Sequence, residues 1–305
     1  MNADATRWIA VDWGTSHLRA WVFGTGAEPL ARLSSDAGMG GLARDGFEPA
    51  LLALIDAHLP AGRATPVLCC GMVGARQGWI EAPYAAVPGP PPGIDEAVRA
   101  PARDPRLDVR ILPGMAQPEP ADVMRGEEAQ IAGFLEREPG FDGILCLPGT
   151  HTKWVHVSAG EVVSFRTFMT GELFALISER SVLRHGLAGE GWDGDAFAAA
   201  LDDAMSRPEA LAARLFSLRA EGLLHDLAPA TARARLSGLL IGMELAAARP
   251  YWLGRHVALI GAERLAQLYA RALRKQGLES ETAPAEAVTL AGLAAQYRKL
   301  SGARS

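Results

Sequence analysis

Residues 8–23 read WIAVDWGTSHLRAWVF, and this stretch decides the fold class. Residues 8–11 form a short apolar run of strand formers, and residues 17–23 alternate between apolar and other side chains, as strands do. Between them, residues 12–16 place a carboxylate, a glycine and two hydroxyls. The pattern predicts a β-hairpin with a polar turn, and residues 29–33 supply a third strand after the turn at 24–26.

A second stretch repeats this plan. Residues 143–158 read GILCLPGTHTKWVHVS: an apolar strand, a glycine followed by a hydroxyl residue, and another strand. Helical spacing follows the first meander at 48–59 and 127–138, and it dominates the chain after residue 171. The repeated meander is weak internal pseudo-symmetry. It predicts an α/β protein with two related domains, residues 1–138 and 139–305, and a central cleft between them.

The turn of the first hairpin has the residue types of a phosphate site. Gly14 lets the backbone approach phosphate oxygens closely, Thr15 and Ser16 add hydroxyl donors, and Arg19 adds a charged donor. Asp12 ends the strand and suits Mg²⁺, which usually keeps part of its water shell. The alternative is a hairpin turn whose polar side chains satisfy their own backbone. Residues 24–26 do not make a dinucleotide fingerprint, because a strand follows them instead of a helix.

The second hairpin offers Gly149, Thr150 and Lys153 to a phosphate chain. A solvated strand lysine is the alternative for Lys153, and His151 reads more readily as a structural histidine than as a base. Further on, a strand ends at Gly261 and leads through Ala262 and Glu263 into a helix. Such a junction lets the backbone lie flat against adenine or ribose, although an ordinary strand–helix junction looks the same locally.

A carboxylate pair begins the helix that precedes the second hairpin. A kinase acting on an alcohol needs a group that accepts the hydroxyl proton, and a carboxylate at a helix N-terminus is stabilised in its ionised form. Glu127 is our first candidate for this base and Glu128 is the second. The alternative for either residue is a plain partner of the helix dipole.

Charge and composition exclude several classes of protein. The net charge of −5 argues against a nucleic-acid binder, which normally carries a basic stripe. No apolar run approaches ~20 residues, so we expect no membrane span, and the N-terminus does not have the pattern of a signal peptide. The cysteines Cys69, Cys70 and Cys146 lie in apolar runs without zinc-site spacing, which is typical of reduced thiols in a cytoplasmic protein.

Six segments together resemble one family. They are DWGTS at 12–16, CGMVG at 70–74, MRGEE at 124–128, PGTHTKW at 148–154, MTGEL at 169–173 and IGAE at 260–263. In this order they resemble the 2-dehydro-3-deoxygalactonokinase family, within the actin/hexokinase/heat-shock ATPase superfamily. The resemblance implies two ribonuclease H-like (actin-like ATPase) domains. It also implies phosphorylation of 2-dehydro-3-deoxy-D-galactonate at its 6-hydroxyl, with ATP and Mg²⁺, in galactonate catabolism. Many superfamily relatives have aspartate where this chain has Glu127.

The substrate implied by the resemblance is a sugar acid, whose carboxylate needs a cation or a ring of N–H donors. Arg76, in a loop after a strand end, is the first candidate and Arg125 is the second. A kinase for a related sugar acid, a phosphohydrolase of the superfamily and a nucleotide-binding module without catalysis are the alternatives. ATP and the sugar acid are the expected partners, and the sequence leaves a homodimer open.

Overall fold

The computed structural model describes residues 3–302, and the chain folds into two compact units. The first unit comprises the chain up to residue 141, residues 158–164 and the chain from residue 285 onward. The second comprises residues 142–157 and 165–284. The predicted boundary at 138/139 is close to the first of these breaks. The last helix, however, belongs with the first unit, whereas the prediction assigned it to the C-terminal domain.

The first unit is built on a six-stranded sheet of order β3-β2-β1-β4-β7-β6, with a small second sheet of order β5-β8-β9. The three central strands β1, β4 and β7 run parallel, and β2, β3 and β6 are antiparallel to their neighbours. The strands are β1 (Trp8–Trp13), β2 (Leu18–Phe23), β3 (Pro29–Ser35), β4 (Thr65–Gly71), β5 (Tyr84–Ala86), β6 (Val98–Arg99), β7 (Leu107–Ile111), β8 (Gly114–Gln117) and β9 (Asp122–Met124), and the helices are α1 (Phe47–Ile55), α2 (Glu127–Arg137) and α10 (Ala285–Gly302).

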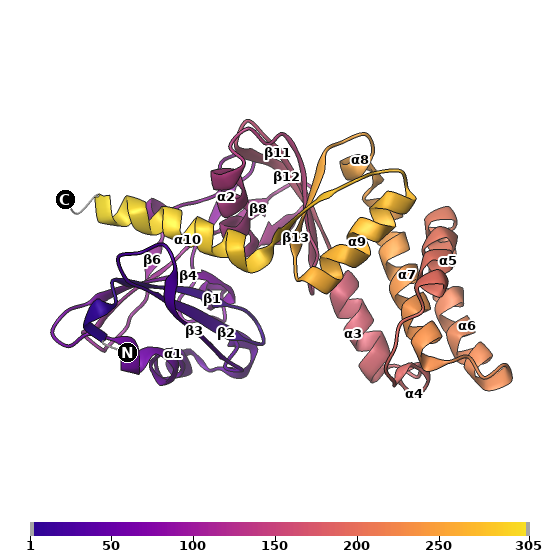
Figure 1. Cartoon of the computed structure of the whole chain (residues 1–305), viewed down its shortest axis with the longest axis horizontal. Coiled ribbons are helices and arrows are strands. Elements are labelled where there is room, and N and C mark those ends of the chain that lie inside the picture. Colours follow the sequence, from indigo (N-terminus) through magenta and orange to yellow (C-terminus); the bar gives the residue numbers. More distant parts are fainter. Residues whose placement is uncertain (1–2, 303–305) are drawn as a thin grey trace. The chain divides into compact units, whose positions relative to one another are not determined.

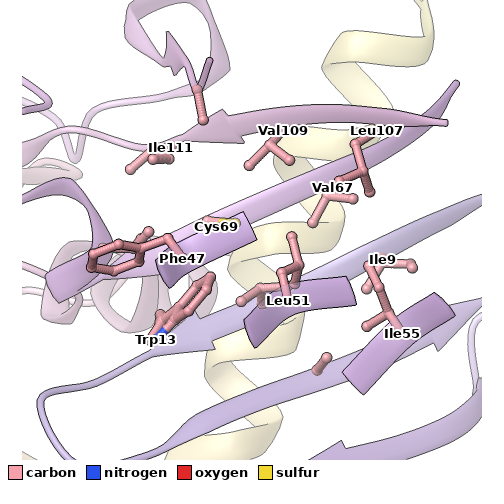
Figure 2. Packing of buried hydrophobic residues seen from close by; sticks show 14 of the residues in the cluster. Ile9, Trp13, Phe47, Leu51, Ile55, Val67, Cys69, Leu107, Val109 and Ile111 are labelled. Atoms are coloured by element: carbon pink, nitrogen blue, oxygen red, sulfur yellow. The ribbon is translucent and has the colours of Figure 1, made fainter. Parts of the chain in front are cut away.

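Strand β1 is buried on both faces, which explains its nearly continuous apolar sequence. Its odd-numbered side chains, such as Ile9 and Trp13, pack against α1, whose core residues recur every four positions, as Figure 2 shows. Its even-numbered side chains Trp8 and Ala10 pack in a second cluster that includes residues of α10. Asp12 follows in this even series and therefore lies on the α10 side of the sheet, at the strand end.

The last helix completes the first unit by direct contact between two helix backbones. Helix α10, yellow in Figure 1, packs against α2. A Cβ added at Gly292 would lie 2.1 Å from the carbonyl oxygen of Ala129, and one at Gly133 would lie 1.8 Å from that of Val288. Only glycine at both positions permits this approach.

The second unit contains a five-stranded sheet of order β12-β11-β10-β13-β14. Strands β10, β13 and β14 are parallel, and β11 is antiparallel to β10. The strands are β10 (Gly143–Leu147), β11 (Thr152–Ser158), β12 (Glu161–Phe168), β13 (Val257–Gly261) and β14 (Glu281–Pro284), and the helices are α3 (Thr170–Arg180), α4 (Arg184–Leu187), α5 (Gly194–Ser206), α6 (Leu211–Leu224), α7 (Pro229–Ala247), α8 (Arg249–Trp252) and α9 (Glu263–Lys275).

The two sheets share one topology. In each sheet, the first strand of a three-stranded meander also pairs in parallel with a later strand, β1 with β4 and β10 with β13. The order β3-β2-β1-β4-β7 therefore corresponds to β12-β11-β10-β13-β14. The repeat inferred from the two hairpin sequences is confirmed, and with it the fold class of two ribonuclease H-like α/β domains. The predicted cleft stays a prediction. Among residues 3–302, no helix is both long and apolar enough to cross a membrane.

We expect Gly292→Ala to lower the melting temperature, because the new methyl group must push α10 away from α2. Overpacking of this kind usually costs about 1–3 kcal/mol. The control is Gly222→Ala on α6, where a Cβ would meet nothing within 4 Å and better helix propensity should raise stability by about 0.5–1 kcal/mol. Thermal unfolding followed by circular dichroism measures both. Equal shifts in the two variants would contradict the backbone contact.

Candidate active site

Asp12 lies where three structural elements of the first unit meet. In the antiparallel register of β1 and β2 it is directly opposite Arg19, and in the parallel register of β1 and β4 it is beside Cys70. Arg19 Nη2 lies 2.9 Å from Asp12 Oδ2. The pKa of Asp12 is raised by burial, lowered in part by Arg19, and raised further by the charge of Glu127. Sheet register thus brings together the predicted metal ligand and the predicted phosphate arginine.

The third element is the N-terminus of α2, which reaches this point through two glycines. Gly71 ends β4 with φ +94°, and Gly126 precedes α2 with φ +110°, both in the left-handed region that favours glycine. A Cβ at Gly126 would lie 3.2 Å from the Cα of Gly71. This contact seats the first turn of α2, with Glu127 and Glu128, beside the end of β1.

The two glutamates have different environments. Glu128 is buried, and both of its carboxylate oxygens accept from the backbone N–H of Gly126, at 2.8 and 2.7 Å. Glu127 is partly exposed, and its Oε2 accepts from the backbone N–H of Arg125 at 3.0 Å. Burial raises the pKa of Glu128 to about 8, with a further contribution from the charge of Glu127. Of the predicted pair, only Glu127 presents its side chain to solvent.

The β1–β2 turn is held by the loop that follows β3. Met39 N–H donates to the carbonyl of Gly14 at 3.0 Å, and Gly40 N–H donates to that of Thr15 at 2.9 Å. The side chains of Thr15 and Ser16 remain exposed. The turn is therefore fixed in position while its hydroxyls face solvent, as a phosphate-binding loop requires.

The two candidate arginines for the substrate carboxylate differ in freedom. Arg76 is exposed in the loop after β4, and its backbone carbonyl accepts from Arg44 Nη2 at 2.9 Å. Arg125 is held in place: its Nη2 donates to the carbonyl of Ala82 at 2.8 Å, and its guanidinium lies 4.2 Å from the centre of the Tyr84 ring. Its Nε and Nη1 are enclosed and have no hydrogen-bond partner in the described part of the chain.

In the second unit, the start of α3 packs on the second predicted phosphate hairpin. A Cβ at Gly171 would lie 2.2 Å from the carbonyl oxygen of Gly149, and Glu172 N–H donates to the carbonyl of Thr150 at 2.9 Å. His151 Nε2 lies 2.6 Å from a carboxylate oxygen of Glu172. Lys153, predicted to face phosphate, is instead buried at the start of β11. The MTGEL segment thus supports the hairpin.

A cavity of about 430 Å³ opens beside this hairpin, within the second unit. The predicted Gly149, Thr150 and Ala262 line it together. Gly261 precedes Ala262, and a Cβ added to it would lie 3.4 Å from the carbonyl oxygen of Pro148, whereas Glu263 is exposed and accepts from Gln267. Because β10 and β13 are neighbouring parallel strands, their ends bring the phosphate hairpin after β10 and the strand–helix junction after β13 to the same cavity.

The other walls of the cavity come from helices α3, α7 and α9 and from the segment before α5. They are mainly apolar, with two arginines, and include Phe174, Trp192, Arg233, Ser237, Arg264, Leu265 and Leu268. The Arg233 guanidinium lies 5.0 Å from the centre of the Phe174 ring. Leu265 and Leu268 of α9 line the cavity and also pack against the hydrophobic core of the second unit.

We expect stability to fall with rising pH through Glu128. The folded state keeps this proton up to a pH of about 8, whereas the unfolded chain loses it near 4.5, so folding binds a proton between these values. The melting temperature of Glu128→Gln relative to the native chain should therefore increase from pH 5 to 8 and then level off. Glu136→Gln, at an exposed position on the same helix, is the control. A difference that does not vary with pH would contradict the buried carboxyl.

Comparison with known proteins identifies the family of the chain. A family model described as 2-keto-3-deoxy-galactonokinase matches residues 12–296. The chain is 43% identical to a probable 2-dehydro-3-deoxygalactonokinase of Rhizobium meliloti (strain 1021), over 96% of this chain and 97% of that protein. It is 34% identical to the 2-dehydro-3-deoxygalactonokinase of Escherichia coli (strain K12), over 94% and 96%.

A solved structure is similar over the same length. A crystal structure from Sinorhizobium meliloti, described as a 2-dehydro-3-deoxygalactonokinase protein, superposes with a TM-score of 0.87 at 40% identity and covers 96% of this chain and 99% of its own. The terms 2-keto and 2-dehydro denote the same oxidised carbon, so all of these findings agree with the resemblance of the six sequence segments. The chain belongs to the 2-keto-3-deoxy-galactonokinase family.

Proposed function

We propose that this protein transfers the terminal phosphate of ATP to the 6-hydroxyl of 2-dehydro-3-deoxy-D-galactonate. The observation that carries the proposal is the family match over residues 12–296, which includes every residue assigned to either candidate site. Each half of the reaction is assigned to one unit. The first unit supplies the acid–base group and the second supplies the nucleotide cavity.

Glu127 is the general base of the proposed reaction. Its carboxylate is partly exposed at the first turn of α2. Arg125 N–H donates to one oxygen and restricts the side chain, and in the proposed reaction the carboxylate accepts the proton of the sugar hydroxyl. Glu128 is buried behind it, so we assign Glu128 a structural part: it fixes the N–H of Gly126 and thereby the start of the helix.

The acidic pair Asp12 and Glu127 fits a phosphate-bound Mg²⁺ held through water. Burial is the main reason that the pKa of Asp12 is raised, and the charge of Glu127 adds to it; a cation would relieve this repulsion. Within residues 3–302 no three His, Cys, Asp or Glu side chains gather into a direct metal site. One or two carboxylates plus substrate phosphates are the usual protein environment of this ion, which would neutralise phosphate charge during transfer.

The cavity of the second unit is the proposed ATP site. Its volume of about 430 Å³ lies within the range of small-molecule pockets, and its apolar walls suit a purine ring. Arg233, stacked on Phe174, presents a flat cationic surface of the kind that stacks on aromatic bases. Gly149 and Thr150 at its edge provide backbone amides and a hydroxyl for the phosphates.

The location and the partners of the protein follow from the same proposal. ATP is made and used in the cytoplasm, where thiols stay reduced, and Cys69, Cys70 and Cys146 are all free and buried. We therefore propose a cytoplasmic protein with a sugar acid and ATP as its partners. A homodimer is compatible with this proposal.

We expect Glu127→Gln to lower kcat by about 10²–10⁴-fold, because the amide keeps the shape of the side chain but cannot accept a proton. ATP binding should be unchanged, since the nucleotide cavity is formed by residues of the second unit. A coupled assay of ADP formation with the sugar acid, and calorimetric titration with ADP, measure the two quantities. Glu136→Gln is the control, and near-normal turnover of Glu127→Gln would exclude it as the base.

The same assay separates the alternatives. A kinase forms ADP only when 2-dehydro-3-deoxygalactonate is present, whereas a phosphohydrolase releases phosphate without it. A nucleotide-binding module would bind ADP but would neither phosphorylate the sugar acid nor release phosphate from ATP. A panel with the gluconate-derived epimer decides which sugar acid is preferred.

Arg76 is the proposed partner of the substrate carboxylate, because its guanidinium is exposed whereas that of Arg125 is held by Ala82 and Tyr84. We expect Arg76→Ala to raise the KM for the sugar acid about 10–100-fold with little change in the KM for ATP. Arg76→Lys keeps the charge but loses the bidentate fork, so its KM should lie between the two. An unchanged KM in Arg76→Ala would transfer the role to Arg125.

A further inference from the structure

A carboxylate with no role so far lies in the interior of the second unit. Glu244 interrupts an apolar stretch of α7 that includes Leu240, Ile241 and Leu245, and its exposed fraction is 0%. Its Oε1 accepts from Trp154 Nε1 at 2.8 Å, and its Oε2 accepts from Tyr269 OH at 2.8 Å and from the Thr170 hydroxyl. All three donors are neutral.

Such a group is hard to explain by stability alone. A buried carboxylate with hydrogen bonds but no cation loses its hydration, and apolar residues of similar size often replace buried charges without loss of stability. Burial raises the pKa of Glu244 to about 7, against the opposing effect of the hydrogen bonds from Thr170, Trp154 and Tyr269. The carboxylate is therefore a cost to the fold that another benefit must offset.

Its partners belong to three other elements, two of which line the cavity. Thr170 begins α3 and Tyr269 lies on α9, and both line the cavity, whereas Trp154 lies on β11. The Tyr269 hydroxyl also lies 3.0 Å from the Thr152 hydroxyl at the start of β11. One carboxylate thus connects α3, α7, α9 and the first strand after the phosphate hairpin.

The connection reaches the hairpin from both ends. On one side, Thr170 is followed by Gly171, which packs on the carbonyl of Gly149, and by Glu172, whose N–H binds the carbonyl of Thr150. On the other side, Tyr269 binds Thr152, two residues after Thr150. Residues 149–152 therefore keep their place relative to the cavity walls only while α3 and α9 keep theirs.

We propose that Glu244 is a positioning residue for the nucleotide: through Thr170 and Tyr269 it fixes the phosphate hairpin relative to the helices that hold the base. This inference rests on the proposed nucleotide site in the second unit. Because ATP contacts both parts at once, an error in their spacing weakens the binding of the whole nucleotide, and the sugar-acid site in the first unit is not involved.

The test is Glu244→Gln, which keeps the size of the side chain. Its amide oxygen can still accept from Trp154, whereas the amide N–H₂ replaces the oxygen that accepts from the Thr170 and Tyr269 hydroxyls, so the variant disrupts these two hydrogen bonds without a change in side-chain size. We expect a melting temperature no lower than that of the native chain. We also expect a dissociation constant for ADP raised about 10-fold and a KM for the sugar acid unchanged.

Glu221→Gln is the matched control. Glu221 on α6 binds Arg235 of α7 in a two-pronged ion pair that does not reach the cavity, so its loss should lower the melting temperature and leave ADP binding unchanged. A Glu244→Gln protein that binds ADP within about twofold of the native chain overturns the inference. If the native chain itself fails to bind ADP, the proposed nucleotide site falls and this inference with it.

A second variant decides the case in which Glu244→Gln is unfolded or less stable than Glu221→Gln. Tyr269→Phe keeps the ring in the core and removes the hydroxyl that joins Glu244 to Thr152. We expect it to raise the dissociation constant for ADP at least about 3-fold with the KM for the sugar acid unchanged. Native-like ADP binding by Tyr269→Phe would overturn the inference.

Discussion

The backbone of Gly126 packs directly against that of Gly71, and the whole first-unit site depends on this contact. A Cβ at Gly126 would lie 3.2 Å from the Cα of Gly71, and one at Gly71 would lie 2.6 Å from the carbonyl oxygen of Trp13 at the end of β1. The approach sets Glu127 within electrostatic reach of Asp12, and sheet register then adds Arg19. The chemistry of the site thus follows from glycines that carry no functional group. The acidic and basic side chains form one site only because the backbones of Gly71 and Gly126 can lie in contact.

Both units place a glutamate in their interior near the residues assigned to function, but they satisfy it differently. Glu128 is held by the backbone N–H that precedes its own helix, so its interaction is local in sequence. Glu244 is held by side chains from three distant elements. The first arrangement orients a helix start, whereas the second joins elements that would otherwise pack only through apolar contacts. Neither residue needs to touch substrate for its hydrogen bonds to matter.

Much of the fold was predictable because local pattern and chain order determine it. The two hairpins, the strand ending at Gly71 and the helix beginning at Glu127 follow from apolar runs and glycines. Strand β14 was missed because Glu281–Pro284 is short, largely exposed and ends in proline, so neither apolar character nor alternation marks it. The place of α10 in the first unit was missed because the Gly133–Gly292 contact joins residues far apart in sequence.

The candidate site was predictable to a similar degree. Gly149, Thr150 and Ala262 line one cavity as their motifs indicated, but Phe174 and Arg233 lie on helices whose packing no spacing rule gives. Lys153 read as a phosphate ligand, yet its position opposite Leu147 on a buried strand pair directs it inward. The assignment of Glu127 over Glu128 also needed burial, because both occupy the first turn of one helix.

The return of α10 to the first unit has a consequence for how the chain is made. During synthesis the ribosome releases all strands of the first sheet long before residues 285–302 exist, and the whole second unit is translated in between. Until then Trp8, Ala10 and Leu68 lack the apolar cover that Leu293 and Leu300 later provide. Until α10 is made, the N-terminal half of the nascent polypeptide therefore exposes apolar side chains on this face of the sheet. Chaperones bind surfaces of this kind.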